Sequence, residues 1–215
     1  MDMIQQVTPA AIERRSMEII DGELAERGNE LDERNAAVIK RVIHTSADFD
    51  YAENLRFSSG AVDAGIAALK AAATIVTDTN MARAGVSKPS LAKLGGEAVC
   101  FMADEDVAQE AHDRGTTRAV ASMDKAALLL DAPVIAIGNA PTALIRVLEL
   151  IEHGVMAPRL VIGVPVGFVN VEASKELLME RTDTPWIVAR GRKGGSNIAA
   201  AICNALLYEA TGRQL

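Results

Sequence analysis

The amino-acid sequence predicts a single α/β domain over residues 1–215, with a mainly parallel sheet of about five strands covered by helices on both faces. Two observations carry this prediction. Several runs of strand length are apolar throughout, and stretches with helical periodicity lie between them. Strands without a polar face are buried on both sides, and strands that alternate with helices pair in parallel. No linker, repeat or low-complexity tract divides the chain.

An extra helical region is expected before the first strand. Residues 11–27 and 31–44 have helical periodicity, and a further helix begins at Ser59 or Gly60. The second helix carries an apolar stripe formed by Val38, Ile39, Val42 and Ile43. Such a stripe buries one helix face and leaves the opposite face for polar side chains.

Strands and helices then alternate along the rest of the chain. The expected strands are residues 73–77, 98–102, 133–138, 160–164 and 186–189. The expected helices are residues 107–114, 118–130, 142–153, 171–180 and 196–209. Ligands of open α/β sheets bind beyond the carboxyl ends of the strands, so the connections that follow the strands are the first candidates for a site.

The composition narrows the class of function. A formal net charge of −7 argues against a general nucleic-acid binder, but it does not exclude an acidic small-molecule substrate. No apolar run has the length of a membrane span and no targeting signal is visible, so a cytoplasmic protein is expected. Cys100 and Cys203 lie far apart, and no group of residues has convincing metal-ligand spacing, so no metal site is expected.

Four connections after expected strands are rich in Gly, Pro, Asn or Thr, namely residues 77–80, 138–142, 163–168 and 190–196. Ordinary turn chemistry explains much of this composition, and for residues 139–142 architecture is the favoured interpretation.

The last of these connections is the most suggestive. Arg190, Arg192 and Lys193 precede a glycine pair that opens a helix. Glycines allow backbone N–H groups to approach a ligand, helix N-termini favour anions, and arginine suits carboxylates. The lysine precedes the glycines, so this is not a nucleotide-binding P-loop. A carboxylate site and a solvated basic turn both stay open.

His44, one of three histidines, is the candidate for proton transfer. It follows Arg41 by three residues, so both side chains project from one helix face. A histidine near a helix C-terminus has its protonated form favoured by the helix dipole, which suits a general acid. Asp48, Asp50 and Glu53 follow closely and are candidates to orient it. A packing or surface histidine is the alternative.

Taken together, these motifs resemble the precorrin-8X methylmutase (precorrin isomerase) family of cobalamin biosynthesis over nearly the whole chain. The resemblance is carried, in order, by residues 13–16, 41–44, 115–118, 137–144, 163–169 and 190–196. One such segment alone is modest support, whereas all six in order are highly specific.

The resemblance implies a flavodoxin-like fold with three α/β/α layers, and a homodimer with active sites at the dimer interface. It implies an isomerase that moves a methyl group from C-11 to C-12 of a corrinoid macrocycle without a cofactor. The catalytic histidine of the family falls on His44. Its substrate-contacting positions fall on Ser16, Arg41 and Arg118, with Arg118 reaching into the partner subunit's site.

Further substrate-binding residues are predicted from the same motifs: Arg15, Thr45, Asn139, Gly167, Arg190, Arg192, Lys193, Gly195 and Ser196. The acetate and propionate carboxylates of such a substrate would explain local arginines in an acidic chain. Residues 45–51 resemble the cobalt-first branch of the family, so cobalt-precorrin-8 is the predicted substrate and cobyrinate the product. The alternatives are the metal-free precorrin-8X, which gives hydrogenobyrinate, a non-catalytic corrinoid carrier, and an enzyme for another carboxylated metabolite.

Overall fold

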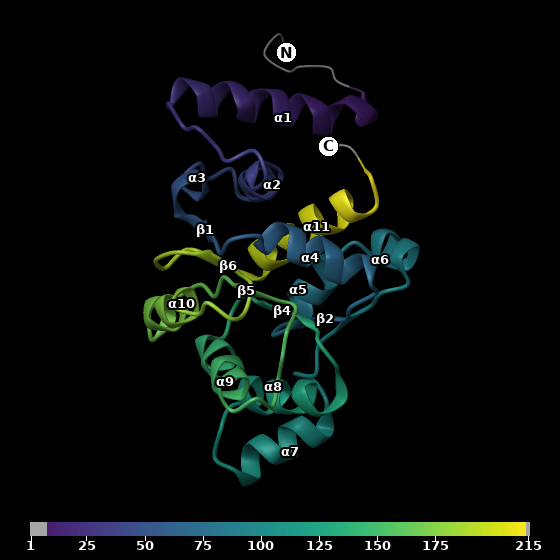
Figure 1. Ribbon diagram of the computed structural model, residues 1–215, viewed down its shortest axis with the longest axis vertical. Helices are drawn as coiled ribbons and strands as arrows, with labels where there is room; N and C mark the ends of the chain where they lie inside the picture. Colours follow the sequence, from purple (N-terminus) through teal and green to yellow (C-terminus); the bar gives the residue numbers. More distant parts are fainter. Residues whose placement is uncertain (1–7, 214–215) are drawn as a thin grey trace, which may run out of the picture.

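A computed structural model describes residues 8–213 of the protein (Figure 1). Its sheet has the strand order β1-β6-β5-β4-β2-β3. The parallel strands are β2 (Ile75–Thr77), β3 (Ala98–Val99), β4 (Val134–Ile137), β5 (Leu160–Gly163) and β6 (Trp186–Ala189). Numbered by themselves in chain order, they give the order 2-1-3-4-5 of flavodoxin-like sheets. The predicted fold class is therefore confirmed.

The side chains of each central strand belong alternately to two separate hydrophobic cores, one on each face of the sheet. Along β4, Val134 and Ala136 join one core, whereas Ile135 and Ile137 join the other. The same alternation separates neighbouring residues in β2, β5 and β6. Side chains of a strand point alternately to opposite faces, so a strand that is apolar throughout needs helices on both sides.

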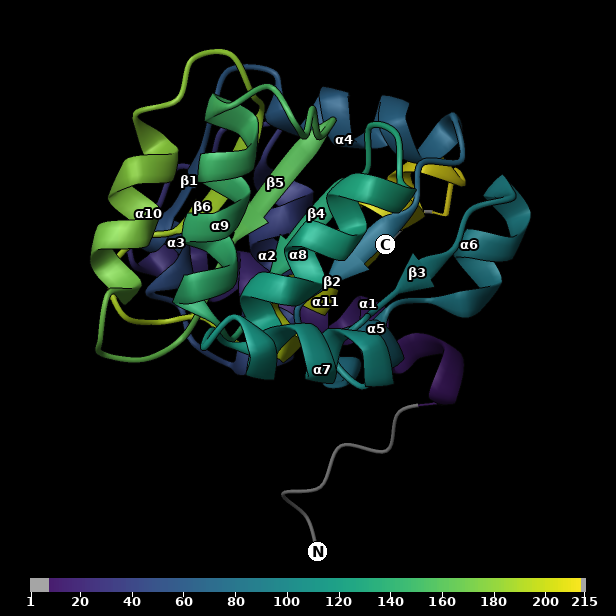
Figure 2. The same ribbon diagram turned by 90° about the horizontal axis from the view of Figure 1, so that it is seen from below.

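Helices form a layer on each face of the sheet. One face is covered by α2 (Ala36–Ser46), α4 (Ala61–Lys70), α5 (Asn80–Gly85), α6 (Lys88–Leu94) and α11 (Ser196–Ala210). The other is covered by α8 (Arg118–Leu129), α9 (Pro141–Glu152) and α10 (Val171–Met179), which lie in front of the sheet in Figure 2. Two helices lie farther out: α1 (Pro9–Glu26) beside α2, and α7 (Glu105–Asp113) against α8 (Figure 1).

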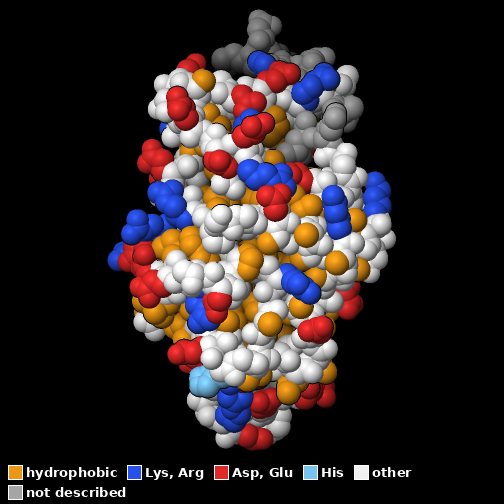
Figure 3. Space-filling view, in the orientation of Figure 1, with side chains coloured by type: hydrophobic (Ala, Val, Ile, Leu, Met, Phe, Trp, Pro, Cys, Tyr) orange, Lys and Arg blue, Asp and Glu red, His pale blue; other side chains and the backbone are white. Residues whose placement is uncertain are grey.

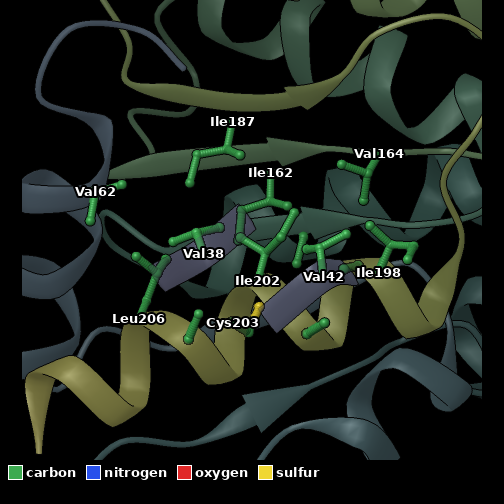
Figure 4. Packing of buried hydrophobic residues seen from close by; sticks show 14 of the residues in the cluster. Val38, Val42, Val62, Ile162, Val164, Ile187, Ile198, Ile202, Cys203 and Leu206 are labelled. Atoms are coloured by element: carbon green, nitrogen blue, oxygen red, sulfur yellow. The ribbon is translucent and has the colours of Figure 1, made fainter. Parts of the chain in front are cut away.

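The helix α11 joins α2 to the sheet. Figure 4 shows Ile198 and Ile202 of α11 beside Val42 of α2, Leu206 nearer Val38 of α2, and Ile162 of β5 next to Ile202. The apolar stripe predicted for residues 38–43 is therefore the buried face of α2. Because that face is held in the core, the polar face of α2 has a defined position.

The structure adds elements that the sequence patterns did not predict. The strand β1 (Leu55–Phe57) pairs antiparallel with β6, and α3 (Tyr51–Asn54), α5 and α6 are short helices. Such short elements show no full period, so tertiary pairing decides them. The strand expected over residues 98–102 is limited to β3.

The helix expected over residues 31–44 begins later, at Ala36. The carboxylate of Asp32 accepts hydrogen bonds from the backbone N–H groups of Arg34 and Asn35, which forms a turn in place of the first helical turn. Among the helices of residues 8–213, none is long and apolar enough to cross a membrane.

Candidate active site

His44 lies half-buried in the last turn of α2. The helix ends at Ala47, whose φ of 53° is left-handed and whose N–H donates to the carbonyl oxygen of Ile43 at 2.7 Å. This turn brings Asp48 and Asp50 to the carboxyl end of β6, where Lys193 binds both. The imidazole therefore stands near the end of the sheet at which ligands of this fold bind.

His44 belongs to a cluster that we call the Arg41 network, formed by Glu13, Arg41, His44, Tyr208 and Arg213. Arg41 is 8% exposed, and its guanidinium lies 3.3 Å from His44 Nδ1 through Nη1 and donates to Glu13 Oε1 at 2.5 Å through Nη2. The other oxygen of Glu13 accepts from Arg213 at 2.8 Å. Both guanidinium carbons lie over the ring of Tyr208, at 5.0 Å for Arg41 and 4.2 Å for Arg213.

The Arg41 network favours the neutral form of His44. Burial lowers the pKa of the imidazole below its ordinary value, the positive charge of Arg41 lowers it further, and Glu13 opposes both. This corrects the expectation that the helix dipole favours the protonated form. The hydrogen bond from Arg41 lowers the pKa of the Glu13 carboxyl, so Glu13 is a carboxylate at neutral pH. Arg41 therefore meets an anion and a neutral imidazole.

The cations of the 190–196 connection are each paired with carboxylates. Lys193 donates to Asp48 at 2.6 Å and to Asp50 at 2.5 Å, which raises the pKa of its ammonium to about 12. Arg190 pairs with Glu176 at 3.0 Å, and Arg192 pairs with Glu172 at 3.7 Å. Figure 3 shows the same interspersion of acidic and basic side chains over one face of the molecule.

These pairs correct one expectation about His44. Asp48 and Asp50 bind Lys193, whereas the side chains that act on His44 are those of Arg41 and Glu13. Asp48 and Asp50 therefore hold the 190–196 connection, which we call the basic connection, and do not orient the imidazole.

A buried lysine binds the backbone of the basic connection. Lys175 of α10 is fully buried, and its ammonium donates to the carbonyl oxygens of Gly191 and Lys193 at 2.7 and 2.8 Å. Burial lowers the pKa of this ammonium to about 8. A Cβ on Gly194 would collide with the carbonyl of Val164, so only glycine fits there.

The 163–168 connection is joined to the basic connection through the backbone. Gly195 N–H donates to the carbonyl of Val164 at 2.9 Å, and Gly167 N–H donates to the carbonyl of Arg192 at 3.2 Å. The predicted site residues Gly167, Arg192 and Gly195 therefore lie in one assembly at the carboxyl edge of the sheet.

The two remaining connections meet at the switch point between β2 and β4. The fully buried carboxylate of Asp78 accepts from the N–H of Gly138 at 2.8 Å, of Asn139 at 2.8 Å and of Ala140 at 2.7 Å. Burial raises the pKa of the Asp78 carboxyl, and the three N–H groups oppose this shift. Donors that bind ligand anions in other proteins are thus occupied by a side chain of this chain.

Ser196 joins the basic connection to this switch point. Its hydroxyl lies 2.8 Å from the hydroxyl of Thr79, which follows Asp78. The side chain of Asn139 is exposed at the same edge. All four connections singled out in the sequence therefore meet at one end of the sheet.

The remaining predicted residues lie in two places. Ser16 is on α1, one turn after Glu13, and its hydroxyl donates to the carbonyl of Ile12 at 2.9 Å. Thr45 is exposed beside His44, and its hydroxyl donates to the carbonyl of Arg41 at 2.9 Å. Arg15 is exposed and pairs with Glu18 at 3.1 Å.

Arg118 is placed differently from the other predicted arginines. It begins α8, on the face of the sheet opposite α2. It is exposed, and within residues 8–213 its side chain makes no hydrogen bond or ion pair. The structure of one chain therefore does not bring Arg118 into the Arg41 network.

Sequence patterns missed several residues that organise the site. Glu13 had a usable signal, because it precedes Ser16 by one helical turn in a motif segment. Tyr208 and Arg213 had none, since they reach Arg41 and Glu13 from the far end of the chain. Within the described part of the chain, no group of three His, Cys, Asp or Glu side chains is arranged to hold a metal ion.

Comparisons with known proteins agree with these motifs. A family model described as precorrin-8X methylmutase matches residues 11–209. The chain is 44% identical to the cobalt-precorrin-8 methylmutase of Salmonella typhimurium, over 97% of this chain and 98% of that protein. It is 40% identical to the precorrin-8X methylmutase of Pseudomonas aeruginosa, over 93% and 95% of the two chains. The crystal structure of precorrin-8X methyl mutase from Thermus thermophilus superposes with a TM-score of 0.85 at 39% identity, covering 95% of this chain and all of that chain (100%).

Proposed function

The chain belongs to the precorrin-8X methylmutase family, and from that premise we propose that it is the cobalt-precorrin-8 methylmutase of cobalamin biosynthesis. It is an isomerase that moves a methyl group from C-11 to C-12 of the macrocycle and gives cobyrinate. The observation that carries the proposal is a half-buried histidine, held by a buried guanidinium, beside a connection with three cations. As the sequence predicts, the proposed location is the cytoplasm.

His44 is the proposed proton-transfer group. A methyl migration around a conjugated macrocycle leaves the atom count unchanged, so it needs a proton placed correctly and no nucleophile or redox group. The Arg41 network supports this role, because it holds the imidazole neutral and fixes its orientation. A neutral imidazole has one nitrogen that donates and one that accepts, so the nitrogen facing the macrocycle can take part in proton transfer while the other is held by Arg41.

The basic connection is the proposed binding site for substrate carboxylates. The partners of Arg190 and Arg192 are exposed carboxylates, and exposed ion pairs contribute only about 0–1 kcal/mol. A substrate carboxylate can therefore replace Glu176 or Glu172 at small cost. The exposed ring of Phe168 suits a flat macrocycle: Phe168 is 80% exposed, and Arg192 lies over its ring at 5.5 Å.

A homodimer with shared sites is part of the same proposal. Arg118 is exposed on the face of the sheet opposite the Arg41 network, so a second copy of the chain is the proposed route by which Arg118 reaches a substrate near His44. Arginine at a helix N-terminus also adds its charge where the backbone already favours anions.

The metal-free substrate precorrin-8X is the second candidate, since a relative of that name is 40% identical to this chain. Cobalt-precorrin-8 is preferred because of the resemblance of residues 45–51 to the cobalt-first branch. A non-catalytic carrier would need the basic connection but not His44.

The deciding measurement is turnover of cobalt-precorrin-8, followed through its visible spectrum. We expect His44→Ala to reduce kcat by about 10²- to 10⁴-fold, the usual contribution of a general acid or base. His112→Ala is the matched control, because His112 is exposed on α7. Undiminished turnover by His44→Ala contradicts the acid/base role. Binding without turnover by the wild type favours the carrier.

Mixed dimers test the shared site. We expect Arg118→Ala to weaken substrate binding more than folding. Co-expressed His44→Ala and Arg118→Ala chains should regain about a quarter of wild-type turnover, since half of the dimers are mixed and each has one intact site of two. If Arg118 acts in its own chain, the mixture will show no regain.

A further inference from the structure

The atom of His44 that faces away from Arg41 has a definite protonation state. A guanidinium has only donors and stays charged in proteins, so Arg41 Nη1 donates the 3.3 Å hydrogen bond and His44 Nδ1 accepts it. In a neutral imidazole, the nitrogen that does not accept carries the hydrogen. The Arg41 contact therefore selects the tautomer with hydrogen on Nε2.

Glu13 is what holds Arg41 in the position that makes this contact. The Arg41 guanidinium is buried, and the one carboxylate that binds it among the described residues is that of Glu13, at 2.5 Å. Its buried Nε has no hydrogen-bond partner, so Glu13 and the ring of Tyr208 fix the plane of the group. Removing one partner of a buried pair leaves an uncompensated charge, which then reorients toward water or another anion.

Arg213 fixes Glu13 from the other side. The guanidinium of Arg213 donates to the second oxygen of the Glu13 carboxylate at 2.8 Å. Like that of Arg41, it also lies over the ring of Tyr208. One carboxylate on α1 thus orients two guanidinium groups, one of which contacts His44. None of these contacts requires Glu13 itself to touch the imidazole.

We infer that Glu13 is a positioning residue that, through Arg41, sets His44 in the Nε2–H tautomer, so that the histidine presents a donor to the macrocycle. The inference rests on the proposed function and deepens it, because it names the atom through which His44 acts. A hydrogen on Nδ1 would face an N–H group of Arg41, and two donors cannot form a hydrogen bond with each other. His44 therefore meets the macrocycle as a neutral imidazole with its N–H at Nε2. A proton that it gives leaves Nε2, and the Arg41 guanidinium at Nδ1 then faces the negative charge left on the ring.

Nitrogen NMR of the full-length protein, with ¹⁵N-labelled histidine rings, tests the inference directly. Three histidines give few signals, and His44→Gln assigns the one that matters. In the wild type above the titration of His44, we expect a protonated Nε2 and an unprotonated Nδ1. In Glu13→Gln, we expect this preference to be lost in favour of a mixture of tautomers.

Matched variants separate positioning from general damage to α1. Glu18→Gln changes an exposed acid on the same helix and should leave the tautomer unchanged. Glu13→Asp keeps the carboxylate and should largely preserve the tautomer, whereas Arg41→Lys keeps the charge but loses the guanidinium fork and should not. With cobalt-precorrin-8, Glu13→Gln should lower kcat about 10- to 100-fold, as partners that orient a histidine do, with little change in KM.

The outcomes distinguish this inference from the proposed function. A wild-type ring protonated on Nδ1, or an unchanged tautomer in Glu13→Gln, overturns the role of Glu13 whether or not the protein turns over substrate. A changed tautomer with unchanged kcat in an active enzyme overturns it as well. A protein that shows the expected tautomers but converts no corrinoid contradicts only the proposed reaction.

Discussion

Two regions of this protein bury charge in opposite ways. At the carboxyl edge of the sheet, Asp78 and Lys175 are fully buried and bind backbone groups: three N–H groups for the carboxylate and two carbonyls for the ammonium. In the Arg41 network, the buried guanidinium binds side chains, namely those of Glu13 and His44. One region uses buried charge to shape loops, and the other uses it to set the state of a titratable group.

The two regions differ in whether their buried charge can take part in chemistry. The general rule for open α/β sheets directs attention to the switch point between β2 and β4. There the backbone donors are already occupied by Asp78, so they form architecture. The charge that is partnered by side chains lies instead on α2, at Arg41, and its balance changes with protonation of His44. Backbone partners cannot titrate, whereas side-chain partners can.

The largest effect is expected from breaking the backbone-bound region at Asp78. Asp78→Ala leaves three N–H groups without their acceptor, and an unsatisfied buried donor costs about 1–3 kcal/mol. Since Asn139 and Ala140 lie near solvent, we expect a loss of about 3 kcal/mol in the free energy of unfolding, measured with urea at pH 7. Asp131→Ala, at an exposed position, is the control. A loss below about 1 kcal/mol would show that Asp78 is not structural.

A smaller effect is expected at Lys175. Lys175→Met leaves the carbonyls of Gly191 and Lys193 unpaired, but it also removes the cost of burying an ammonium. We expect a loss of about 1–2 kcal/mol in the free energy of unfolding, together with weaker binding of cobalt-precorrin-8. Lys70→Met changes an exposed lysine and serves as control. Unchanged substrate affinity would separate Lys175 from the binding site.

The smallest effect is expected in the Arg41 network, where His44 makes the free energy of unfolding depend on pH. The pKa of His44 is lowered in the folded protein, so on acidification the unfolded chain takes up a proton first. Stability from this group is complete above pH 6.5 and is lost as the pH falls below that value. His44→Gln should therefore reduce the loss of unfolding free energy between pH 7.5 and 5.5. An identical loss in wild type and variant would mean that the fold does not disfavour the imidazolium.

The fold was predictable where local pattern decides it. The strand β6 covers the residues expected from their apolar run, and α8 begins at the expected Arg118. The strand β1 was not predictable, because three residues carry no period and their pairing with β6 forms the strand. Likewise, the turn made by Asp32 replaces the predicted start of α2.

The contacts of the site were also predictable only where they lie within one element. The approach of Arg41 to His44 follows from their spacing on one helix, and the sequence predicts it. The partners Glu13 and Arg213 lie near opposite ends of the chain, and their meeting depends on the packing of α1 and α11 against α2. The sequence predicted the wrong direction for the His44 pKa, because burial and the Arg41 charge lower it and the burial of His44 arises only in the folded chain.

Residue order and spacing alone were enough to predict the fold class, the buried stripe of α2, the candidate histidine and the family. These depend on the order and spacing of residues within single elements, which local geometry converts directly into faces and turns. Three features arise only when the chain folds: which charges meet, the filling of the switch point by Asp78, and the favoured form of His44. Electrostatic and hydrogen-bonding energies depend on distance and burial, and both arise when distant segments pack together.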